Sequence, residues 1–160
     1  MHRASRYLIT LVLLFLFEKN FAQKIPAPKG WVNDFEHLLT SREEQTLDSL
    51  LALFEKQTTN QLALVTLDSN FTTAAAFDDF IISLHNSWGV GLKGKNNGIV
   101  VGISAQLRRI RISNGEGIIA RLSDAETARI IDEIMIPEFK KGAYFTGIQN
   151  GLIAIIAKLQ

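Results

Sequence analysis

Four oxygen-bearing side chains in the second half of the chain suit the chemistry of a hard cation. They are Asn96 and Asn97 in the glycine-rich turn 89–98, Glu116 in the turn 114–117, and Asp124 shortly after it. Carboxylate and amide oxygens are the ligands that calcium and magnesium prefer, so a divalent cation is the first cofactor to consider. The alternative is that the Asn and Gly residues supply only turn geometry, and that Asp124 stabilises a helix N-terminus through the helix dipole.

Basic side chains near the same turns could hold an anion. They are Lys93 and Lys95 in the turn 89–98, and Arg109 and Arg111, which share one face of a predicted strand. The turn is not a P-loop, because the spacing GxxxxGK[ST] is absent and a strand rather than a helix follows. A flexible turn and a solvated strand face that protects a sheet edge are the alternatives.

The sequence contains no complete catalytic motif. It has no cysteine, which excludes a Cys nucleophile, thiolate metal sites and disulfides. His37 and His85 lie far apart, without the Ser and carboxylate pattern of a triad. The sequence leaves open whether the protein is an enzyme.

Hydrophobic periodicity predicts the elements that position these residues. Strands are expected at 62–67, 99–104 and 108–113, and amphipathic helices at about 41–57, 77–88, 124–136 and 145–159. Thr40 or Ser41 caps the first helix, Ser123 with Glu126 forms a capping box, and Pro137 is expected to end the third helix. The predicted fold class is therefore α/β, with a mixed central β-sheet sandwiched by α-helices in a single domain.

The predicted topology brings the two turns together. A strand, a helix and a second strand require a parallel pair with a right-handed crossover, and the third strand pairs as an antiparallel hairpin. The turn 89–98 enters the second strand and the turn 114–117 leaves the third. Both turns should therefore lie at one edge of the sheet, which is the candidate site.

The N-terminus has the pattern of a cleavable secretory signal. Arg3 and Arg6 precede an apolar run at 7–17, which is too short to span a bilayer, and Ala22 is a small residue at the expected cleavage point. We expect a signal peptide at 1–22, an extended lead-in at 23–30 and the folded domain at 31–160. The localisation expected is export to the periplasm or secretion.

The composition of the remaining chain narrows its partners. Without residues 1–22 the basic and acidic counts fall from 17 and 16 to 14 and 15, a net charge of about −1. This balance gives no general attraction to nucleic acid. No later stretch is long and apolar enough to span a membrane, so the mature domain is expected to be free in solution.

Several segments, in order and with the right spacing, resemble the TPM domain, a family named for a thylakoid lumen protein, a photosystem II repair protein and a nematode receptor modulator. The segments are WVND at 31–34, WGVGLKGKNNG at 88–98, RIRI at 109–112, NGEG at 114–117, IPEF at 136–139 and GAY at 142–144. The resemblance covers residues 31–157. It departs from the family where Asn96 replaces a frequent Asp, Glu116 an aromatic residue and Ala143 another Asp.

The resemblance implies an α/β sandwich, weak acid phosphatase activity, divalent-cation binding and assistance to membrane complexes. It also places Asp34 with the candidate metal ligands, which become Asp34, Asn96, Asn97, Glu116 and Asp124. The function expected is an exported accessory domain that binds a calcium-like cation and assists an unidentified envelope or secreted protein. The alternative is a weak metal-assisted acid phosphatase.

Overall fold

The computed structural model describes residues 24–160, and the predicted signal peptide lies outside the described residues. The chain forms one four-stranded sheet in the order β1 (Val32–Asp34), β2 (Gln61–Thr66), β3 (Gly98–Ser104) and β4 (Arg109–Asn114). The first three strands are parallel, and β4 is antiparallel to β3. The mixed α/β fold predicted from the order of the elements is therefore confirmed.

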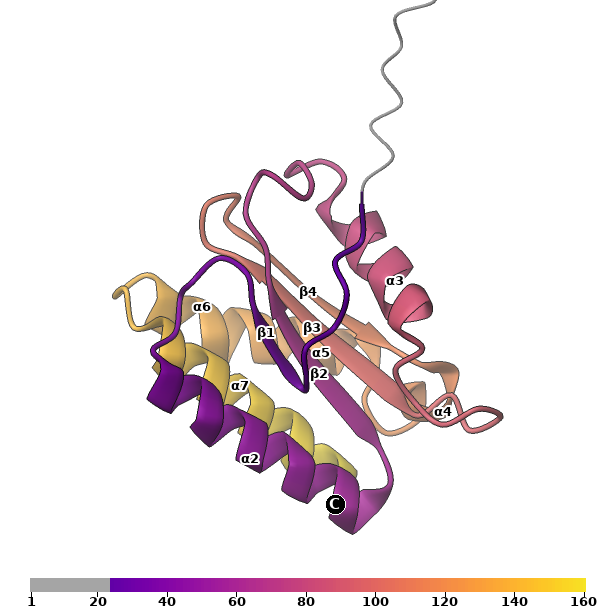
Figure 1. Cartoon of the computed structure of the whole chain (residues 1–160). Coiled ribbons are helices and arrows are strands. Elements are labelled where there is room, and N and C mark those ends of the chain that lie inside the picture. The colour runs from indigo at the N-terminus through magenta and orange to yellow at the C-terminus, as the bar shows by residue number, and fades with distance from the viewer. Residues whose placement is uncertain (1–23) are drawn as a thin grey trace, which may run out of the picture.

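Helices cover both faces of this sheet (Figure 1). One face packs on α2 (Ser41–Thr58), α7 (Tyr144–Leu159) and a π-helical segment, η1 (Ile130–Met135). The other face packs on α3 (Phe77–Trp88). Leu62 and Leu64 of β2 enter the first core while Ala63 and Val65 enter the second, because successive side chains of a strand point to opposite faces.

Local signals fix the long helix α2. Thr40 is its N-cap: the Thr40 side chain accepts a hydrogen bond from the Glu43 amide, and the Glu43 carboxylate accepts one from the Thr40 amide. Leu47, Leu51 and Phe54 recur at helical spacing and are buried. The predicted capping box is confirmed, with Thr40 as the cap.

The helix that begins at the Ser123 cap does not end at Pro137, so that prediction is wrong. It runs from α5 (Asp124–Arg129) through the π-helical segment η1 into α6 (Ile136–Phe139). The Ile136 amide donates to the Ile131 carbonyl, five residues back, and Pro137 then occupies the first turn of α6. Proline is tolerated there because the first turn of a helix does not need its missing N–H group.

Two short elements were not predicted. β1 is three residues long and pairs parallel with the end of β2, from Val32 opposite Leu64 to Asp34 opposite Thr66. The helix α4 (Glu116–Ile119) starts within the predicted turn 114–117. Within residues 24–160, no helix has the length and apolar character needed to cross a membrane.

Candidate functional site

The two glycine-bearing turns meet at one edge of the sheet, as the topology predicts. The Gly115 amide donates to the Gly98 carbonyl at 2.8 Å, and the Gly117 amide donates to the Asn96 carbonyl at 3.0 Å. The approach requires glycine, because a Cβ atom at Gly115 would lie 2.2 Å from the Asn96 carbonyl oxygen. The edge is thus a close contact between two backbones.

A cleft of about 530 Å³ opens beside this contact. Its walls come from the end of α3, the turn 89–98 and the end of β4, and its polar lining consists of His85, Asn86, Lys93, Asn96, Ser113, Asn114 and Glu116. The Asn96 side-chain amide lies 3.4 Å from a carboxylate oxygen of Glu116. Asn114 donates to the Leu122 carbonyl, while its buried side-chain oxygen has no partner among the described residues.

Asn97 lies at the same edge but serves the framework. It is buried, and its side-chain oxygen accepts a hydrogen bond from the Leu92 amide at 2.8 Å. Its side-chain nitrogen donates to the Thr59 carbonyl at 2.7 Å and contacts the side-chain oxygen of Asn60. The oxygen end of this amide therefore braces the turn 89–98 internally, and the nitrogen end joins the turn to the residues just before β2.

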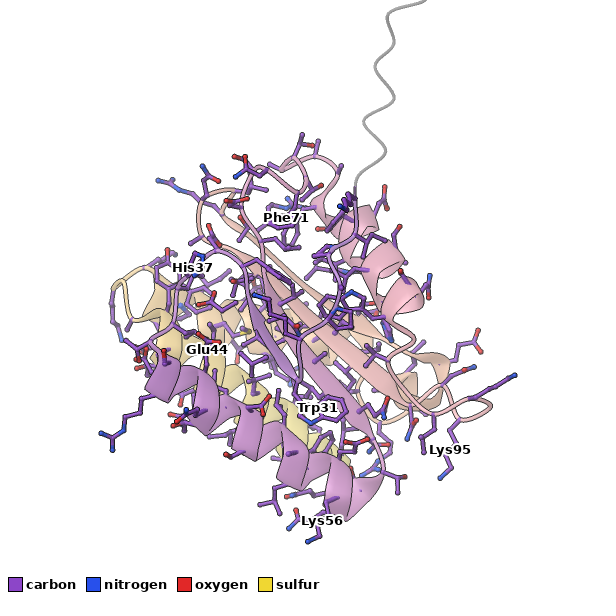
Figure 2. The ribbon with its side chains drawn as sticks, viewed as in Figure 1. Trp31, His37, Glu44, Lys56, Phe71 and Lys95 are labelled. Atoms are coloured by element: carbon purple, nitrogen blue, oxygen red, sulfur yellow. The ribbon has the colours of Figure 1, made fainter. Side chains whose placement is uncertain are left out.

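The expected position of Asp34 is wrong. Asp34 pairs with Thr66 at the C-terminal ends of parallel strands, whereas Asn96 and Asn97 precede the N-terminal end of β3. His37, three residues after Asp34, and Lys95 accordingly lie at opposite ends of the molecule (Figure 2). The Asp34 carboxylate accepts hydrogen bonds from the Leu38 and Leu39 amides and from the Thr66 hydroxyl, so it organises the loop after β1.

Asp124 is exposed at the start of α5, next to the Ser123 cap. The hydrogen bond from Asn114 to Leu122 connects the segment before α5 to the end of β4, which places this helix start near the candidate edge. No described contact joins Asp124 to Asn96 or Glu116.

The predicted anion-binding residues are dispersed. Lys93 lines the cleft, whereas Lys95 projects from the tip of the same turn (Figure 2). Arg109 forms an ion pair with Asp78 of α3 at 2.9 Å. The Nε atom of Arg111 is buried without a partner among residues 24–160. The four cations do not form one cluster.

Sequence reasoning missed a buried pair in the cleft wall, His85 of α3 and Ser113 of β4. The His85 Nδ1 atom lies 2.9 Å from the Ser113 hydroxyl, and Nε2 lies 3.3 Å from the Val90 carbonyl. A carbonyl only accepts, so Nε2 carries the proton and Nδ1 accepts from Ser113. Burial lowers the pKa of His85 below its ordinary value of 6.5. The two residues are 28 positions apart, and only the packing of α3 on β4 shows that they meet.

The side-chain oxygens at the edge would hold a cation only weakly. Glu116 has one carboxylate, and Asn96 and Asn114 have neutral side-chain oxygens, that of Asn114 being without a partner among residues 24–160. No group of three or more His, Cys, Asp or Glu residues that could hold a metal occurs in the described part of the chain. A calcium ion takes six to eight oxygen ligands, so backbone carbonyls and water would have to provide the rest.

The comparisons with known proteins agree with this fold. The TPM domain matches residues 32–158. The solution NMR structure of the N-terminal domain of a protein from P. gingivalis is 32% identical, with a TM-score of 0.74 over 81% of each chain. The BA42 protein from Bizionia argentinensis is 18% identical, with a TM-score of 0.63 over 78% of this chain and 83% of that one.

A third solved structure, the N-terminal domain of a Corynebacterium glutamicum protein, is 10% identical, with a TM-score of 0.61 over 87% of this chain and 86% of that one. No match to a curated protein was found. The last two structures share the fold at low identity, while the family match extends from β1 to the end of α7. The protein is therefore a member of the TPM domain family.

Proposed function

We propose that this TPM domain binds a divalent cation, calcium or magnesium, in the cleft where the turns 89–98 and 114–117 meet. The observation that carries the proposal is the pairing of Asn96 with Glu116 in a cleft that Asn114 also lines, where the buried Asn114 oxygen has no hydrogen-bond partner within residues 24–160. A cation gives that oxygen a positive partner and replaces the weak 3.4 Å contact between the two side chains. One carboxylate gives low affinity, with a dissociation constant of roughly 10⁻⁴ to 10⁻³ M.

The role we propose for the domain is that of an exported accessory protein. The secretory pattern at residues 1–22 supports export to the periplasm or secretion. The absence of a complete catalytic motif from the sequence favours action on another envelope or secreted protein. The cation would stabilise the arrangement of the two turns, and the partner would contact the cleft edge.

A titration of residues 23–160 with Ca²⁺ or Mg²⁺, followed by NMR, tests cation binding. Chemical shift changes are expected at 89–98 and 114–118. The affinity should fall about tenfold in Glu116→Gln, because the only carboxylate lining the cleft is lost. Glu133→Gln is the matched control, since Glu133 is an exposed carboxylate of η1 away from the cleft. If neither ion moves a resonance at these turns, the proposal is refuted.

A second candidate, a weak metal-assisted acid phosphatase, is favoured by Lys93, which lines the same cleft as Glu116. A bound cation would polarise a phosphoryl oxygen, and Lys93 would face the charge that develops on it. The test is hydrolysis of a generic phosphomonoester with and without the metal. Turnover that requires metal and falls in both Glu116→Gln and Lys93→Gln would support it. Cation binding without turnover would favour the accessory role.

A further inference from the structure

A second cleft, of about 480 Å³, lies at the other end of the β3–β4 pair. It opens between the β3–β4 hairpin and the segment that joins α6 to α7, and its apolar lining consists of Ile103, Ile110, Ile136, Phe139 and Tyr144. Its charged lining is wholly basic, with Arg108, Arg109 and Lys140 and no acidic residue. This volume is within the range of small-molecule sites.

Two aromatic rings form one wall of this second cleft. The rings of Phe139 and Tyr144 lie 5.1 Å apart at an interplanar angle of 34°. Gly147 on α7 makes room for Phe139, since a Cβ atom there would come within 2.5 Å of the Phe139 ring. Both aromatic side chains remain partly exposed, so they offer an apolar surface to a ligand.

The cations at the rim differ in how they are neutralised. Arg109 is paired with Asp78 at 2.9 Å. Arg108 and Lys140 are exposed and take part in none of the ion pairs found in residues 24–160. Two cations without a carboxylate partner therefore flank an aromatic wall, an arrangement that is complementary to an anion with an apolar body.

Arg108 stands at a backbone position that suits glycine or asparagine. Its φ angle is 54°, in the left-handed region, and it is the last residue of the hairpin turn before β4. Arg108 lines the second cleft from this backbone position. The same fact makes Arg108→Gly a clean variant, because it removes the cation and relieves the backbone at once.

We propose that the second cleft binds a small carboxylate attached to an apolar ring or branched chain. The apolar body lies against Phe139 and Tyr144, and the carboxylate receives charge-assisted hydrogen bonds from Arg108 and Lys140. The chemistry needed is an apolar group about three bonds from a carboxylate carbon. A free arylalkanoic acid and the C-terminal residue of a polypeptide both provide it.

The test is an NMR titration of residues 23–160 with 3-phenylpropionate and with a short acetylated peptide ending in Phe. Each probe has a neutral twin, 3-phenylpropionamide and the C-terminally amidated peptide. Shifts are expected at 103–110 and 136–144, and each twin should bind roughly tenfold more weakly or worse, because the charge-assisted hydrogen bonds are lost. Binding of the acid alone identifies a free acid as the ligand, and binding of the peptide alone identifies a chain terminus.

Variants separate recognition from folding. Arg108→Gly and Lys140→Gln should each weaken binding roughly tenfold without lowering the thermal unfolding midpoint. Arg129→Gln, at an exposed cation of α5 that does not line the cleft, should change nothing. Equal binding of the charged and neutral twins, shifts elsewhere, or full affinity in both variants would each overturn the proposal. The result does not depend on cation binding, because the shifts expected for a cation are at the opposite edge.

Discussion

The contact between the two turns makes Gly115→Ala the most informative single change. A Cβ atom at this position would lie 2.2 Å from the Asn96 carbonyl oxygen, whereas such atoms do not approach closer than about 3.0 Å. The turns must separate by about 0.8 Å, which weakens the hydrogen bonds that Gly115 and Gly117 donate. Each bond contributes about 1 kcal/mol, and the alanine recovers about 0.4–1 kcal/mol by restricting the unfolded chain. We expect a net loss of about 1–2 kcal/mol in the free energy of unfolding.

Gly94→Ala, in the same turn, is the matched control. Gly94 has a φ angle of 82° and no atom near the added Cβ, so only the left-handed backbone opposes alanine. That strain of about 1–2 kcal/mol is partly offset by the unfolded-state gain of about 0.4–1 kcal/mol, which leaves a loss between about 0 and 1.6 kcal/mol. Urea unfolding measures the stabilities, and NMR measures the position of the turns. Amide shifts at 96–98 and 115–118 should move in Gly115→Ala and not in Gly94→Ala. A Gly115→Ala protein with native stability and native shifts would refute the reasoning.

Three further predictions test other parts of the framework. Asn97→Ala should lower the free energy of unfolding by about 2–4 kcal/mol, measured in urea, because it leaves the Leu92 amide and the Thr59 carbonyl without their partner; the exposed Asn70→Ala should have little effect. In the unchanged protein, stability should fall as the pH drops below 6.5, because the pKa of His85 is lowered in the folded state and the unfolded chain therefore takes up the proton first. His85→Gln should remove this part of the pH dependence of stability. The decline below pH 4.5 should persist in that variant, because the pKa values of Glu43 and Glu126 are lowered by hydrogen bonds from Thr40 and from Lys158 respectively. Asp34→Asn should destabilise the fold by about 1–3 kcal/mol through its contacts with Leu38, Leu39 and Thr66, yet leave any cation shifts at 89–98 unchanged.

The parts of the fold that local chemistry determines could be predicted. The capping boxes at Thr40 and Ser123 mark helix starts, and the order of strand, helix, strand and hairpin determines which turns share an edge. The meeting of Asn96 with Gly115 and Gly117 follows from that order alone. It required no knowledge of side-chain packing.

The features that were not predicted from the sequence depend on contacts between distant segments. β1 is a buried strand, but it was not predicted because two of its three residues, Asn33 and Asp34, are polar. The polar groups of the buried Asn33 are paired: it donates to the Gly30 and Leu64 carbonyls and accepts from the Lys29 amide. Asp34 was placed by resemblance, and no pairing rule from the sequence indicated that β1 would join the far side of β2. The contact between His85 and Ser113 likewise depends on how α3 packs on β4.

In the proposed cation site, the contribution of geometry and the contribution of charge can be tested with different variants. Two backbone hydrogen bonds join the turns. The side-chain oxygens proposed to hold a cation there are those of Asn96, Asn114 and Glu116. With one carboxylate, affinity rests on how well the turns hold these oxygens in place. Glu116→Gln removes the charge and leaves the backbone contact, whereas Gly115→Ala opens the contact and leaves every donor. If the position of these oxygens contributes most to the affinity, Gly115→Ala should weaken cation binding at least as much as Glu116→Gln does. If Glu116→Gln weakens binding more, the charge of Glu116 contributes most.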